Sequence, residues 1–143
     1  MLLTSLFWSR AHGGATHFPI ALVFASAFFD AIGFYSQSIP RKQQLNATGY
    51  FLVILSAFGC LGAVATGLAL SQWQVGGTGL MLRHHLVVWP AVALIIGLGT
   101  WRCLVRNRPS GLGFKIYLGV VLVACALIAG AGFFGGEMLL SGS

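Results

Sequence analysis

The stretch SRAHGGATHFPIALVFASAFFDAIG, residues 9–33, decides the fold class of this chain. From Phe18 onward it is almost wholly apolar, as expected for a helix that crosses a bilayer. Two histidines, His12 and His17, precede the apolar run, and Asp30 lies within it. Because ionisable side chains are costly inside a membrane and usually mark function there, these three residues define candidate sites.

The composition of the whole chain agrees with a membrane protein. Hydrophobic residues make up 57% of the 143 residues and charged residues only 7%, against roughly 25% charged residues in soluble domains. Four apolar segments have about the length of a membrane-spanning helix, at residues 18–35, 47–70, 85–101 and 114–134. Their connections are too short to hold another domain. We therefore expect one all-α domain over residues 1–143, an integral membrane four-helix bundle.

The basic residues divide unequally between the two sides of this bundle. One side has only Arg10 and Arg83, whereas the first and third connections with their flanks carry the other six of the eight, namely Arg41, Lys42, Arg102, Arg106, Arg108 and Lys115. The positive-inside rule then places both termini on the outer side, which is the periplasm for a bacterial inner membrane. Since these charges are spread through loops and form no basic face, the net charge of +6 does not indicate nucleic-acid binding.

All four histidines and one of the two acids belong to the outer side. The first apolar segment begins after His17, the third begins at His84 and His85, and Glu137 follows the fourth. Pro19 is expected in the first turn of the first helix. The segments HFPIALVFA and HHLVVWPAVAL both open with histidine followed by proline, which predicts two helical hairpins related by an axis along the membrane normal. His17 would then face His84 or His85 across that axis.

Facing histidines favour a b-type haem, which needs axial imidazoles, an apolar slot and positive charge for its propionates. His17 with His85 or His84 would be the metal ligands, and Arg10 or Arg83 would meet the propionates. Adjacent helical residues differ by about 100° in direction, so His84 and His85 cannot both face one central metal. Of the two, we take His85 as the inward residue.

Three other readings of these residues stay open. Three histidines with Glu137 could form a mononuclear zinc or non-haem iron site. A histidine and a carboxylate at the interface, such as His12 and Glu137, could exchange protons with a quinone. The histidines could also be interfacial residues with satisfied hydrogen bonds. The three cysteines lack CxxC spacing and read as packing residues.

Asp30 needs a separate explanation. It lies twelve residues below Phe18, which is about 18 Å along a helix, so the carboxyl group must be paired or protonated. Arg102, at the inner end of the third helix, could reach it by extending its side chain. We expect a structural tie of Asp30 to Arg102 or to a polar side chain; a proton relay is the alternative, and a single buried acid argues against a long one.

The chain also resembles the DUF2231 family of uncharacterised four-helix membrane proteins, whose first helix begins His-Pro, then Val-His-Phe-Pro-Ile-Ala, with an aspartate about two-thirds of the way down. The matching positions are His12, His17, Phe18, Pro19 and Asp30, with Gly13 in place of the family's usual proline. Thr66 with Gly67, a histidine opening the third helix, and GGEML at residues 135–139 extend the similarity. The resemblance implies a membrane module that accompanies c-type cytochrome or oxidoreductase partners.

Together these observations predict a membrane electron-transfer subunit of a larger respiratory or photosynthetic redox complex. We expect haem b near the outer face, held by His17 and His85 or His84, with His12 and Glu137 beside it or at a quinone. Partners would supply the substrate chemistry, because a chain with no soluble domain and few charges is not expected to be an enzyme alone. The alternative is a cofactor-free accessory or structural subunit; a transporter ranks third.

Overall fold

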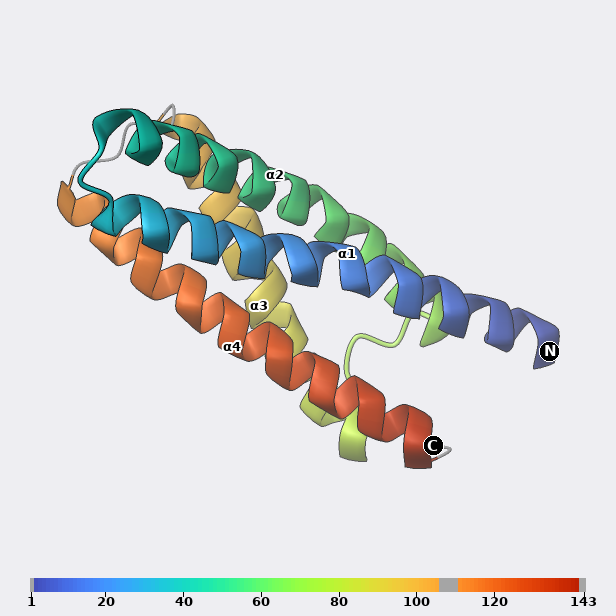
Figure 1. Ribbon diagram of the computed structural model, residues 1–143. Coiled ribbons are helices and arrows are strands. Elements are labelled where there is room, and N and C mark those ends of the chain that lie inside the picture. The colour runs from blue at the N-terminus through green and yellow to red at the C-terminus, as the bar shows by residue number, and fades with distance from the viewer. Residues whose placement is uncertain (1, 106–110, 142–143) are drawn as a thin grey trace.

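The computed structural model describes residues 2–105 and 111–141, and they form four helices (Figure 1). In chain order these are α1 (Leu2–Tyr35), α2 (Ile39–Leu70), α3 (Gly79–Leu104) and α4 (Gly111–Ser141). Each is long and apolar enough to cross a membrane, and the described residues contain no strand. The predicted all-α membrane bundle is confirmed.

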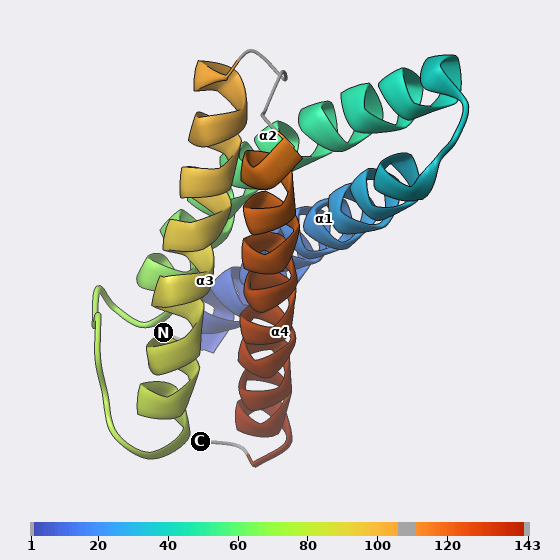
Figure 2. The same ribbon diagram turned by 90° about the vertical axis from the view of Figure 1, so that its left-hand side faces the viewer.

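The four helices are arranged as two hairpins. Helix α1 packs mainly against α2, and α3 against α4, with less extensive packing between the two pairs. The pairs are inclined to each other (Figure 2). Helices α1 and α3 end, and α2 and α4 begin, at one end of the bundle, while both chain termini lie at the other (Figure 1). We call these the connected end and the terminal end.

Helix α1 begins much earlier than the sequence suggested. It starts at Leu2, so Pro19 lies inside the helix and not in its first turn, and that prediction was wrong. A proline within a helix removes one backbone hydrogen bond, yet packing against α2 keeps the preceding turns helical. One such contact is at Pro19 itself, whose carbonyl accepts a 2.9 Å hydrogen bond from the Ser56 hydroxyl on α2.

The interior is packed with small and branched side chains. Each helix contributes a fully buried branched side chain, namely Val23, Val53, Ile95 and Val121 in chain order. Large apolar side chains point outward instead, as with the 61% exposed Phe28 on α1. Because hydrocarbon surrounds a membrane protein, its helices associate through close packing and hydrogen bonds more than by hiding apolar surface. The few buried polar groups are therefore the informative ones.

Candidate functional site

His12 on α1 points toward α2. Its Nδ1 lies 3.1 Å from the carbonyl oxygen of Ala63 and 3.2 Å from Oγ1 of Thr66. A carbonyl oxygen can only accept, so Nδ1 must carry the hydrogen. In the neutral ring this leaves the lone pair on Nε2, the nitrogen that can bind a metal. The contact with α2 thus fixes both the tautomer and the ring orientation.

His84 on α3 repeats this arrangement in the second hairpin. Its Nδ1 lies 2.9 Å from the carbonyl oxygen of Ala131 on α4, so Nε2 again keeps the lone pair. A glycine follows each accepting alanine by four residues and lies beside the ring. A Cβ on Gly67 would stand 2.8 Å from Cε1 of His12, and a Cβ on Gly135 would stand 3.6 Å from Cε1 of His84.

The two half-buried imidazoles come from different hairpins and lie near each other at the terminal end. They are close enough to interact electrostatically. We call His12 and His84 the histidine pair. Each ring contacts the second helix of its own hairpin, and on α1 the residue that makes this contact is His12 and not His17.

His85 makes different hydrogen bonds, although the centroid of its ring lies 5.8 Å from that of His84. Its Nδ1 is hydrogen-bonded to the carbonyl oxygen of Gly76, in the connection between α2 and α3. The ring centroids of His85 and Trp89 are 6.0 Å apart, and the Trp89 indole N–H donates to the Val75 carbonyl at 3.0 Å. His85 therefore fastens the connection, and His84 is the residue that faces α4. His84 and His85 contact different parts of the protein because both lie within α3, where neighbouring residues point about 100° apart around the helix axis.

Of the remaining predicted residues, Arg10, Arg83 and Glu137 lie toward the terminal end of the bundle, whereas His17 is near the middle of α1. His17, Arg10 and Arg83 are exposed, and Glu137 is half-buried near the end of α4. Among the described residues, no group of three or more histidine, cysteine, aspartate and glutamate side chains could hold a metal ion. The metal site of three histidines with Glu137 therefore gains no support from the geometry.

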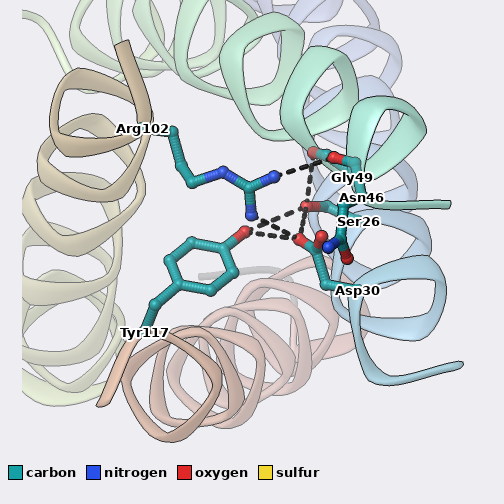
Figure 3. A network of polar contacts seen from close by, with 6 residues as sticks. All are labelled: Ser26, Asp30, Asn46, Gly49, Arg102 and Tyr117. Atoms are coloured by element: carbon teal, nitrogen blue, oxygen red, sulfur yellow. Dashed lines mark hydrogen bonds and ion pairs between the residues drawn. The ribbon is translucent and has the colours of Figure 1, made fainter. Parts of the chain in front are cut away.

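The second polar site surrounds Asp30 (Figure 3). Its Oδ2 lies 3.0 Å from Nη1 of Arg102, and both side chains are fully buried. The predicted pairing is thus confirmed. The Tyr117 hydroxyl donates to the same oxygen at 2.8 Å. Ser26 lies beside them and donates a 2.9 Å hydrogen bond to the Gly49 carbonyl.

This network draws on all four helices. Asp30 is on α1, Arg102 on α3 and Tyr117 on α4, while Nη2 of Arg102 donates to the Asn46 carbonyl on α2 at 2.8 Å. The guanidinium carbon also lies 4.7 Å from the centre of the Tyr117 ring. An unpaired charge is unfavourable in hydrocarbon. Moving the Asp30 carboxylate away from the Arg102 guanidinium would therefore be costly, and this cost stabilises the arrangement of the helices that carry them. The network joins the two hairpins at the connected end.

Sequence reasoning missed Tyr117 and Gly49. A Cβ on Gly49 would overlap all three atoms of the Asp30 carboxylate group, so the absence of a side chain lets the carboxylate lie against α2. A tyrosine in an otherwise apolar segment was a usable signal for Tyr117. His12 and Asp30 are separated by about 27 Å of helix, at 1.5 Å per residue, so the histidine pair and this network are two sites.

Comparison with known proteins gives one match. A family model described as Predicted membrane protein (DUF2231) matches residues 11–142, a range that includes both polar sites. No curated protein and no solved structure matches the chain. With nearly its whole length matched, the chain belongs to the DUF2231 family of predicted membrane proteins.

Proposed function

We propose that the protein is a membrane electron-transfer subunit of a larger redox complex and that His12 and His84 hold a haem b. The observation that supports this is the shared state of the two rings: each Nδ1 is a hydrogen-bond donor to a backbone carbonyl, at 3.1 and 2.9 Å. Histidines that ligate metals are typically held in this way, with the other ring nitrogen free to coordinate. Two such imidazoles, one from each hairpin, fit the donor set of a b-type haem.

The chain's own residues would set the ligand geometry. The carbonyls of Ala63 and Ala131 fix which nitrogen of each ring carries hydrogen. Gly67 has no side chain to push the His12 ring aside. When bound, a haem supplies reversible one-electron transfer, with a potential set by its axial ligands and surroundings. We assign the axial positions to the histidine pair and not to His17 with His85, because His17 is exposed.

The proposed site lies at the terminal end of the bundle. Arg10 and Arg83 are exposed there and would supply positive charge for propionates, and Glu137 is the carboxylate available for proton exchange with a quinone. The distribution of basic residues favours placing this end at the periplasmic face of a bacterial inner membrane. A c-type cytochrome or periplasmic oxidoreductase would then exchange electrons with the site.

A reduced-minus-oxidised absorption spectrum of the purified full chain tests the proposal. We expect a haem b α-band that is lost in His12→Ala and in His84→Ala, because each removes one axial imidazole. His17→Ala is the matched control: it removes an exposed histidine from the same helix and should keep the band. Loss of the band in this control as well would overturn the ligand assignment.

Folding must be checked in parallel, because the band would be absent if the protein binds no haem and also if the protein is unfolded. A wild-type protein with helical circular dichroism and no α-band would contradict haem binding and would favour the cofactor-free accessory subunit. For the accessory role, the decisive measurement is whether the chain persists in membranes when it is expressed without its complex.

A further inference from the structure

An open groove of about 350 Å³ lies at the connected end, where α1 ends and α2 begins. Ala31 and Ile32 form its apolar part, and Tyr35, Ser36 and Arg41 form its polar part. Both Tyr35 and Arg41 are exposed. The groove therefore joins an apolar surface to a positive charge at a membrane boundary.

Neither acidic side chain neutralises that charge, and both lie within the described residues. The sequence has only two acids: Asp30 is buried and paired with Arg102, and Glu137 lies near the far end of α4, at the terminal end. Lys42 is exposed next to Arg41 and adds to the positive charge. The connected end thus offers cationic groups whose counter-charge must come from outside the chain.

An apolar stripe leads from the groove along α1. Phe24, Phe28 and Ile32 follow one another at four-residue spacing, which places them on one face of the helix, and all three are exposed. Tyr35 is 76% exposed beyond the end of this stripe, and tyrosine is enriched at the level of lipid headgroups. The surface therefore has the polarity of a phospholipid, with a charged end and an apolar track.

We propose that this groove binds an anionic phospholipid. The phosphate group lies at the Arg41 guanidinium, and an acyl chain follows Ile32, Phe28 and Phe24. Arginine suits this role because its planar guanidinium donates two parallel hydrogen bonds to a phosphate. Cationic residues beside a membrane segment also attract anionic lipids electrostatically. The lipid site is independent of any haem at the other end of the bundle.

Titration of the full chain in detergent micelles with phosphatidylglycerol and with phosphatidylcholine, read by native mass spectrometry, tests the proposal. We expect tighter binding of phosphatidylglycerol, and about five-fold weaker binding in Arg41→Gln, which corresponds to the roughly 1 kcal/mol that one cationic residue contributes at a membrane surface. Lys42→Gln is the matched control, because it removes the same charge from the neighbouring residue, which does not line the groove. Its effect should be clearly smaller.

Two results would overturn the proposal. Equal weakening in Arg41→Gln and Lys42→Gln would show attraction to overall charge and no groove. Full competition by inorganic phosphate would show that the site takes free phosphate and needs no lipid. Ile32→Ser tests the apolar part of the groove. It should weaken the binding of phosphatidylglycerol and of phosphatidylcholine equally, and unchanged binding would contradict the acyl-chain placement. All of these positions are exposed, so circular dichroism should show unchanged helix content.

Discussion

Replacing Gly49 with alanine should break the buried network around Asp30. The new Cβ would overlap the whole carboxylate group, and α2 cannot easily withdraw because the Gly49 carbonyl accepts a hydrogen bond from Ser26. The carboxylate must therefore move. Its Oδ2 then loses the contacts with Arg102 and Tyr117, at 3.0 and 2.8 Å.

The expected loss of stability is large for one methyl group. Breaking a fully buried ion pair by removing one partner costs about 3–5 kcal/mol, and both side chains here are fully buried. Alanine gains about 1 kcal/mol over glycine inside a helix. The net destabilisation of Gly49→Ala should thus be about 2–4 kcal/mol, a substantial fraction of the unfolding free energy of a small domain.

The measurement is the unfolding free energy in mixed micelles, followed by circular dichroism as the fraction of denaturing detergent rises. Gly62→Ala and Gly119→Ala are matched controls, because a Cβ at either position meets no atom within 4 Å. Both should unfold at or slightly above the wild-type midpoint. If Gly49→Ala unfolds together with them, the argument that only glycine fits beneath the Asp30 carboxylate is refuted.

Two further substitutions address single contacts. Tyr117→Phe removes the hydroxyl that donates to the buried carboxylate at 2.8 Å but keeps the ring, so we expect the unfolding free energy to fall by about 1.5–3 kcal/mol in the same assay. Tyr50→Phe is the control, because the Tyr50 hydroxyl has only a 3.9 Å contact with Cys103, and it should cost less. Equal losses in the two variants would contradict the network's role. Gly67→Ala should displace the His12 ring, against which its Cβ would stand at 2.8 Å, whereas Gly135→Ala makes only an ordinary 3.6 Å contact. The haem spectrum should therefore change in Gly67→Ala and not in Gly135→Ala; the reverse order would contradict the proposed ligand geometry.

Membrane physics made the Asp30 pairing predictable. An acid within an apolar run must find a partner, and Arg102 was the basic residue within reach at the inner end of the third segment. The other members of the network were not predictable in the same way. Gly49 and Tyr117 meet Asp30 only in one register of α2 and α4 relative to α1, and packing across the whole interface sets that register.

The histidine pair shows where sequence reasoning reaches its limit. His12 and His17 are five residues apart, so they differ by about 140° around a helix and only one can face α2. Treating the residues before Pro19 as non-helical concealed this choice. Glycines in a helix cost about 1 kcal/mol each relative to alanine, yet α1 continues through Gly13 and Gly14.

The ion-pair network also influences the relative position of the histidines at the terminal end, because a small rotation of one hairpin about the network moves that end. It fastens the two hairpins to each other about 27 Å of helix away from His12, at 1.5 Å per residue. A rotation of only about 2° of one hairpin about that point would shift the far histidines by about 1 Å over such an arm. The spacing of His12 and His84 is therefore governed partly by the fit of a carboxylate against Gly49 at the opposite end of the bundle.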